Sequence, residues 1–226
     1  MNNPALKHTL YGKPVLVNKP QTTTAKATLL LAHGAGGAMD TLFMESIAAS
    51  IASHANMEVI RFEFEYMQQR RTGGSKRPPP KVEKLTEEWA QWLTHFKNSS
   101  APLLIGGKSM GGRIATLINS DSKTPNNWLG VVCLGYPFHP QNKPEVLRTE
   151  HLSESRSPVL IVQGSRDPFG NSKEVASYTL PALVTTHWID SGNHDLKPLK
   201  RSGSTQSEAL LQAAHTIDAF GQSLYG

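Results

Sequence analysis

The chain has 226 residues, a formal net charge of +5 and 38% hydrophobic residues. This length suits one α/β domain with a sizeable buried core, so we expect a single domain over residues 1–226. No stretch reaches the roughly 18 apolar residues that a membrane-spanning helix requires, which argues against a membrane partner. The N-terminal segment lacks an apolar core followed by a cleavage site, so we expect no secretory signal.

The chain has one cysteine, Cys133, which excludes a disulfide within the chain and argues against a cysteine-based metal cluster. Because this residue lies in the apolar run Val-Val-Cys-Leu-Gly, a buried structural thiol is expected. Together these features predict a cytoplasmic protein, and they leave its oligomeric state open.

Short apolar runs rich in β-branched residues recur along the chain and predict strands. In chain order they are Pro14–Val17, Thr28–His33, Glu58–Phe62, Leu103–Gly106, Gly130–Leu134, Val159–Gln163 and Val184–Ile189. Most are continuously apolar rather than alternating, which is typical of strands that are buried on both faces of a parallel sheet.

Stretches with helical periodicity lie between these strands. They are Asp40–His54, Lys81–Lys97, Ser109–Asn119, Ser172–Tyr178 and Gln206–Leu224. Asp40 is the expected N-cap of the first helix. The segment Gln68–Pro80, with its glycines and three consecutive prolines, predicts an exposed loop. The alternation of strands and helices predicts an α/β fold, with a mostly parallel central sheet, right-handed crossovers and helices on both faces.

The clearest motif is Gly-Lys-Ser-Met-Gly at residues 107–111, between an apolar strand and a helix-compatible run. A sharp strand-to-helix turn of this kind places Ser109 in a strained conformation at the carboxyl edge of the sheet, where it can act as a nucleophile. The two flanking glycines are expected to pack against each other. A phosphate-binding loop is a poor alternative, because it needs a glycine where this chain has Pro102. A chance match to the motif is the other alternative.

A serine hydroxyl needs a base to become a nucleophile, and in this chain order the acid precedes the histidine. Asp167 follows the strand that ends at Gln163, and His194 lies in a loop after the next strand. Both are therefore expected at the same sheet edge as Ser109. Asp190 and Asp195 are rival acids, but one lies too near its strand and the other adjoins His194 in sequence.

An oxyanion hole needs two backbone N–H donors. The amide of Met110, directly after the serine, is one candidate. The second is expected in the glycine-rich turn at residues 33–37, with Ala35 as the first choice and Gly36 as the second. The same glycines can also serve only to allow a tight turn.

Four segments together resemble the α/β-hydrolase superfamily, and its small branch without a lid near the dienelactone hydrolases. They are HGAGG at 33–37, GKSMG at 107–111, GSRD at 164–167 and GNHD at 192–195. More narrowly, HGAGG, GKSMGGR and HDLKP resemble a family of hydrolase-like domains found in small bacterial proteins and in a eukaryotic chromatin-associated protein. The resemblance spans about Thr28 to Leu224. It implies a triad of Ser109, Asp167 and His194, but no particular substrate.

The segment between the strands ending at Leu134 and beginning at Val159 is short and polar, whereas lipases often carry a lid there. A small or soluble substrate is therefore expected. Tyr136, Phe138 and His139 follow a strand at the active edge, where they could either line the pocket or pack a loop.

The predicted function is two-step hydrolysis of a small-molecule carboxylic ester or thioester, without a metal or an organic cofactor. A peptidase and a non-catalytic binding or scaffold protein on the same fold are the alternatives. The basic residues form two clusters: Arg70, Arg71, Lys76, Arg77, Lys81 and Lys84, and Lys197, Lys200 and Arg201. They could favour an anionic substrate, whereas nucleic-acid binding is not expected, because no aromatic residues are interleaved with them.

Overall fold

A computed structural model of the chain describes residues 3–22, 24–99, 101–122 and 128–225. Its centre is an eight-stranded sheet with the order β1-β2-β4-β3-β5-β6-β7-β8. The strands are β1 (Leu6–Leu10), β2 (Lys13–Asn18), β3 (Ala27–Ala32), β4 (Met57–Phe62), β5 (Leu103–Lys108), β6 (Gly130–Leu134), β7 (Val159–Gly164) and β8 (Val184–Ile189). The strands from β3 to β8 pair in parallel, while β1 and β2 join antiparallel at one edge.

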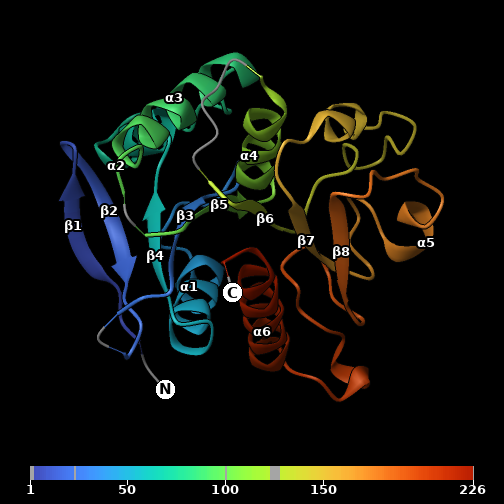
Figure 1. Ribbon diagram of the computed structural model, residues 1–226. Coiled ribbons are helices and arrows are strands. Elements are labelled where there is room, and N and C mark those ends of the chain that lie inside the picture. Colours follow the sequence, from blue (N-terminus) through green and yellow to red (C-terminus); the bar gives the residue numbers. More distant parts are fainter. Residues whose placement is uncertain (1–2, 23, 100, 123–127, 226) are drawn as a thin grey trace.

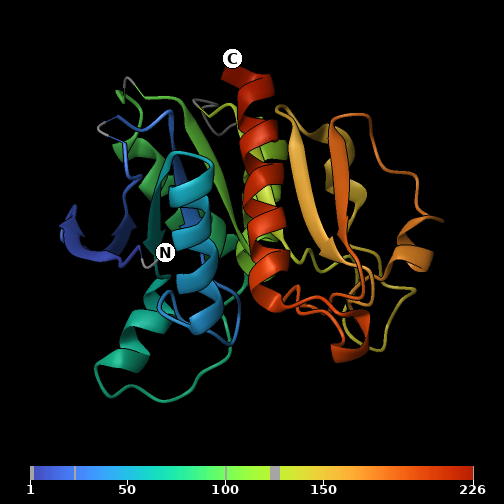
Figure 2. The same cartoon turned by 90° about the horizontal axis from the view of Figure 1, so that it is seen from below.

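The helices cover both faces of this sheet (Figure 1). They are α1 (Leu42–His54), α2 (Glu65–Arg71), α3 (Val82–His95), α4 (Met110–Ser120), α5 (Ser172–Val175) and α6 (Gln206–Tyr225), with short 3₁₀ helices at Glu150–Glu154 and Lys200–Ser202. Figure 2 shows α1 and α6 side by side over one face, and α3 and α4 pack on the other. In the described part of the chain, none of these helices is both long and apolar enough to cross a lipid bilayer.

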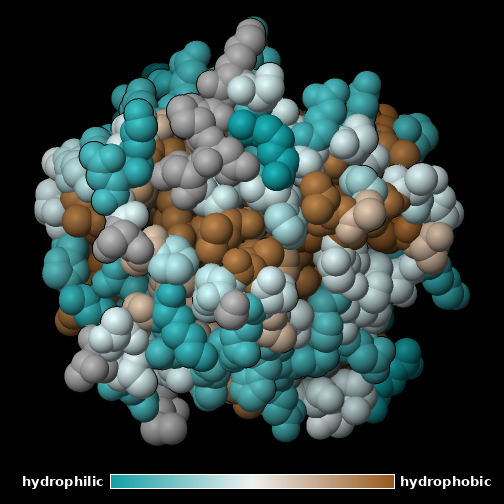
Figure 3. Space-filling model, in the orientation of Figure 1, coloured by the Kyte–Doolittle hydropathy of each residue, from teal (hydrophilic) through white to brown (hydrophobic). Residues whose placement is uncertain are grey.

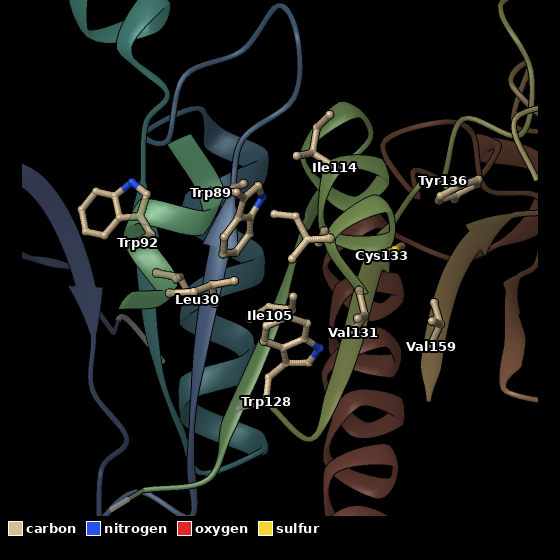
Figure 4. Close-up of a cluster of buried hydrophobic side chains, with 14 of the residues drawn as sticks. Leu30, Trp89, Trp92, Ile105, Ile114, Trp128, Val131, Cys133, Tyr136 and Val159 are labelled. Carbon is tan, nitrogen blue, oxygen red and sulfur yellow. The ribbon is translucent and has the colours of Figure 1, made fainter. Parts of the chain in front are cut away.

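Each face of the sheet contributes to its own apolar cluster. Between the sheet and the layer of α3 and α4 lie aromatic and aliphatic side chains that include Trp89, Trp92, Ile105 and Cys133 (Figure 4). The opposite cluster joins α1 and α6 to the other face. Because β3 and β5 are buried on both faces, their sequences are mostly apolar and do not alternate with polar residues. In Figure 3, apolar residues also show through in a band across the middle of the molecule.

The predicted fold class is confirmed, and every predicted strand is present with bounds that differ by at most two residues at either end. The hairpin strand β1 was missed because its side chains are largely exposed, so its sequence carries no buried apolar run. Tyr11 and Gly12, which both have positive φ (54° and 75°), form its two-residue turn.

Two local predictions were wrong. The N-cap of α1 is Thr41 rather than Asp40, and the carboxylate of Asp40 instead accepts hydrogen bonds from Arg71. The start of the predicted loop Gln68–Pro80 is helical, because α2 continues to Arg71. Helix α2 is short and buries Met67, so its apolar periodicity is too brief to stand out in the sequence.

Candidate active site

Ser109 occupies the turn between β5 and α4. Its backbone has φ 50° and ψ −113°, a conformation that L-residues rarely adopt and that costs about 1–3 kcal/mol. Its N–H donates a 3.0 Å hydrogen bond to the carbonyl of Leu134 at the end of β6. The strained turn is thus fixed to the neighbouring strand, and the serine lies at the first turn of α4, where free backbone N–H groups favour negative charge.

Glycine is required on both sides of Ser109 by the close approach of backbone segments. A Cβ on Gly107 would lie 2.6 Å from the carbonyl carbon of Gly111 and 2.7 Å from the carbonyl oxygen of Ala32. A Cβ on Gly111 would lie 2.6 Å from the carbonyl oxygen of His33. The two glycines of the motif therefore pack against each other and against the end of β3, as the sequence predicts.

Asp167 and His194 are brought together by the loops that follow β7 and β8. The imidazole Nδ1 of His194 and the carboxylate Oδ2 of Asp167 are 2.8 Å apart. The Asp167 side chain is fully buried, whereas that of His194 is 22% exposed. A buried carboxylate on Nδ1 selects the tautomer in which Nε2 is free to accept a proton. The ring of Phe169 packs on the imidazole with centroids 4.5 Å apart.

A buried glutamine, Gln163 at the end of β7, holds the Asp167 carboxylate. Its Nε2 donates to Asp167 Oδ2 at 3.1 Å and to the carbonyl of Tyr136 at 3.0 Å, and its Oε1 accepts from the Tyr136 N–H at 2.7 Å. The other carboxylate oxygen accepts from the N–H of Phe169 at 2.9 Å. Sequence reasoning missed Gln163; the signal for it was a polar residue inside an otherwise apolar strand.

Among the described residues, no hydrogen bond joins the Ser109 hydroxyl to the imidazole of His194. Such catalytic contacts are often long before a substrate binds. Another side chain connects the two segments: Lys108, directly before Ser109, donates from its Nζ to the carbonyl of His194 at 2.7 Å.

The rival acids have other surroundings. Asp195 Oδ1 lies 3.3 Å from Lys108 Nζ, and Asp190 accepts a 3.4 Å hydrogen bond from the hydroxyl of Ser191. Of the three carboxylates considered from the sequence, Asp167 is the one that contacts the imidazole of His194.

The glycine-rich turn at residues 33–37 lies directly beside the serine. A Cβ on Gly34 would be 3.7 Å from the Cβ of Ser109. Neither the N–H of Ala35 nor that of Gly36 donates to another described residue, so both remain available to an oxyanion. The Tyr66 hydroxyl donates to the carbonyl of Ala35 at 2.9 Å and holds the turn from α2.

His33 fixes the other end of this turn. Its Nδ1 donates to the carbonyl of Gly34 at 2.6 Å, and its Nε2 accepts from the N–H of Phe64 at 3.2 Å. Burial lowers the pKa of His33, which favours the neutral ring that this pair of hydrogen bonds requires. His33 therefore has a structural role here.

Tyr136, Phe138 and His139 are buried, with 0%, 0% and 2% exposure. The rings of Tyr136 and Phe138 pack edge to face at 5.0 Å, and the imidazole of His139 faces Glu174. These contacts match the loop-packing alternative for the three residues. In the described part of the chain, no group of three or more His, Cys, Asp or Glu side chains could hold a metal ion.

Part of the first basic cluster is engaged within the protein. Arg71 pairs with Asp40 and Glu63, and Lys84 pairs with Glu65. Arg70 donates to the carbonyl of Arg77. These side chains stabilise the segment after β4.

Comparison with known proteins agrees with the fold. The chain shares its fold with a dienelactone hydrolase from Anabaena variabilis (17% identity, TM-score 0.68, 99% of each chain covered). It also resembles the esterase domain of a Rhodothermus marinus protein (15% identity, TM-score 0.67, 100% of each chain). A serine hydrolase without a lid from Xanthomonas campestris matches over 95% of this chain and 94% of its own (16% identity, TM-score 0.61). Residues 25–222 match the family model described as alpha/beta hydrolase domain, and the chain belongs to that family.

Proposed function

We propose that this protein is a serine hydrolase that cleaves a small or soluble carboxylic ester or thioester through an acyl-enzyme. The observation that carries the proposal is the 2.8 Å contact between Asp167 and His194, at the sheet edge where Ser109 occupies a strained turn. A buried carboxylate on Nδ1, a partly exposed imidazole and a serine at a helix N-terminus are what nucleophilic catalysis requires.

In the proposed reaction, Nε2 of His194 takes the proton of the Ser109 hydroxyl as its oxygen attacks the ester carbonyl. Asp167 stabilises the imidazolium that forms. The oxyanion accepts hydrogen bonds from the N–H groups of Met110 and of Ala35 or Gly36. His194 then donates its proton to the leaving alcohol or thiol. In the second step His194 activates a water molecule, which releases the acid and restores Ser109.

The segment between β6 and β7 supports a small or soluble substrate. Its one described helix is the 3₁₀ turn Glu150–Glu154, which packs against α4 through Leu152 instead of forming an apolar cover over the site. Two of the structural relatives are described as an esterase domain and a dienelactone hydrolase, and another is described as a puromycin-hydrolyzing peptidase. The ester is therefore proposed first, and a peptide bond is the alternative that experiment must separate from it.

The test is labelling with a fluorophosphonate probe, which reacts covalently with activated serines. The intact protein is compared with Ser109→Ala and His194→Ala, and urea unfolding checks that each variant is folded. The proposal requires that the intact protein is labelled and that neither variant is. A folded protein that resists labelling would favour a non-catalytic binding role on the same fold.

A second experiment separates the bond types once labelling succeeds. Hydrolysis of p-nitrophenyl acetate, of acetyl thiocholine and of an alanine p-nitroanilide is followed under the same conditions. The expected order is ester and thioester well above anilide. Faster cleavage of the anilide would instead identify a peptidase.

A further inference from the structure

Two half-buried arginines, Arg113 on α4 and Arg148 in the segment after β6, have guanidinium groups with no partner. Neither group forms a hydrogen bond or an ion pair with any described residue. The Nε of Arg113 is buried without a hydrogen bond. The other described arginines that are not exposed, Arg61, Arg70 and Arg156, all donate to partners within the protein.

The two arginines belong to one cluster with Tyr136 and His151. The Tyr136 hydroxyl donates to the carbonyl of Arg148 at 2.8 Å and lies 3.4 Å from Nε2 of His151. His151 Nε2 is 2.9 Å from the hydroxyl of Thr116, which in turn donates to the carbonyl of Arg113 at 2.8 Å. One continuous set of hydrogen bonds therefore connects the backbones of Arg113 and Arg148.

The charges in this cluster are positive and unbalanced. Burial, followed by the charge of Arg113, lowers the pKa of Arg148. The same two causes lower the pKa of His151 to about 4, so its ring is neutral at pH 7. The described groups that act on one another here are two arginines, a tyrosine and a histidine, without a carboxylate. Half-buried positive charges without a counter-charge are less stable than paired ones, so the cluster favours the binding of an anion.

The cluster is adjacent to the candidate nucleophile. The N–H of Arg113 donates to the carbonyl of Ser109 at 3.0 Å, so Arg113 lies one helical turn beyond the serine, near the start of α4. Side chains on a helix lean toward its N-terminus, which directs Arg113 back toward the serine. Tyr136 follows Gly135, where an added Cβ would lie 3.2 Å from Nδ1 of His194.

We propose that Arg113 and Arg148 form a subsite for a carboxylate carried by the substrate, so that the preferred substrates are anionic esters or thioesters. This inference rests on the proposed hydrolase function and adds the substrate class. Guanidinium groups bind carboxylates through paired, charge-assisted hydrogen bonds, and a half-buried site strengthens them. The subsite involves neither of the basic clusters that stand out in the sequence.

The test compares matched pairs of esters that differ in one negative charge. Mono-p-nitrophenyl glutarate is paired with its methyl ester, which puts the charge on the acyl side. 3-Acetoxybenzoate is paired with phenyl acetate, which puts it on the leaving group. The intact protein should show a kcat/KM at least about tenfold higher for the charged member of one pair, and Arg113→Gln or Arg148→Gln should reduce that ratio by about tenfold to a hundredfold.

Arg201→Gln, an exposed arginine elsewhere on the surface, is the matched control and should leave both rates unchanged. The urea midpoint of each variant shows whether it is folded, and the two arginine variants are independent. Equal rates for charged and neutral esters in both pairs would overturn the subsite while leaving the hydrolase function intact.

Binding separates the two ideas if no ester is cleaved. Titration calorimetry with monomethyl glutarate should then show binding to the intact protein and its loss in Arg113→Gln and Arg148→Gln. Such a result would support the carboxylate site without the reaction, whereas the absence of both binding and charge preference would overturn it.

Discussion

Lys108 Nζ donates a 2.7 Å hydrogen bond to the backbone carbonyl of His194 and lies 3.3 Å from the carboxylate of Asp195. Lys108 directly precedes Ser109, so one side chain connects the turn of the candidate nucleophile to the loop of the candidate base. The side chain is only 8% exposed. Burial lowers the pKa of Lys108, and the charge of Asp195 opposes that change. The Lys108 ammonium group therefore lies inside the site, in contact with the histidine loop, and not on the protein surface.

Replacing Lys108 with methionine should slow fluorophosphonate labelling of folded protein by about tenfold or more, because small displacements between reacting groups cost that much. Methionine keeps the length of the side chain and removes its donor. The rate is measured over pH 5–9 and is divided by the folded fraction. A lower urea midpoint with an unchanged labelling rate would assign Lys108 a purely structural role.

Asp195→Asn is the matched control for that variant. It removes the ion pair but leaves the hydrogen bond from Lys108 to the carbonyl of His194. Its effect on the labelling rate should therefore be smaller than that of Lys108→Met. The opposite order would mean that the ion pair, and not the carbonyl contact, positions the histidine loop.

Two glycines in the same site should differ sharply in how far alanine destabilises the fold. In Gly107→Ala the new Cβ would lie within 2.8 Å of three backbone atoms, so we expect a loss of more than about 4 kcal/mol or a chain that does not fold. In Gly36→Ala nothing lies within 4 Å of the new Cβ, and the N–H is retained. That variant should stay within about 1 kcal/mol of the parent in urea unfolding. Similar stabilities for the two variants would contradict the close packing at Gly107.

The sequence predicts those parts of the fold in which the burial of side chains produces a recognisable apolar pattern. β3, β5, β6 and β7 are buried on both faces, so each is dominated by an apolar run that admits few other interpretations. β1 was missed because it is an exposed edge strand, and its pairing with β2 depends on a turn of only two residues. A short element that gains little from burial has a weak pattern.

The same distinction holds in the site. Ser109, Asp167 and His194 could be named because each follows a strand in a short motif whose backbone geometry is local. Lys108 could not be assigned a role, because it contacts His194, 86 positions away. Gln163 could not be assigned one either, because it acts by joining the nearby Asp167 to Tyr136, which is 27 positions away. The lack of a partner for the guanidinium groups of Arg113 and Arg148 could not be predicted either, because it is visible only in the folded structure, where the neighbouring side chains are placed.

The stability of the protein should fall as the pH is lowered from 6.5 toward 4, in part because of His151. Its folded pKa, about 4, lies below the ordinary 6.5, so in this range the unfolded chain binds a proton that the folded chain does not. The free energy of unfolding is therefore highest above pH 6.5, and this contribution from His151 is lost as the pH falls from 6.5 toward 4. At pH 5 the loss should be at most about 2 kcal/mol.

His151→Gln isolates that contribution, because glutamine can still donate to the hydroxyl of Thr116. Burial also lowers the pKa of His33 and of His187, but both remain in the variant and cancel in the comparison. Urea unfolding at pH 7 and pH 5 should show a smaller loss of stability for His151→Gln than for the parent. Equal losses would show that His151 titrates normally in the folded protein.

The Arg71 guanidinium should stabilise the fold because it pairs with the carboxylate of Glu63, which is buried from water. It donates to both oxygens of Glu63, at 2.7 and 2.6 Å, and to both oxygens of Asp40, whose pKa it lowers. The Glu63 side chain is fully buried, and its other hydrogen bond comes from the N–H of Met39. Arg71→Met would leave that carboxylate with a single donor. The expected loss is about 1–3 kcal/mol, below that for a fully buried pair, because Arg71 is 38% exposed.

Lys84→Met provides the comparison, since the ion pair of Lys84 with Glu65 is more than half exposed at both ends. It should leave the urea midpoint unchanged, because exposed ion pairs contribute little. Adding Glu63→Gln to Arg71→Met should recover part of the lost stability, because a neutral amide costs less to bury than an unpaired carboxylate. If the double variant is no more stable than Arg71→Met, the loss comes from the packing of the arginine stem and not from the buried charge.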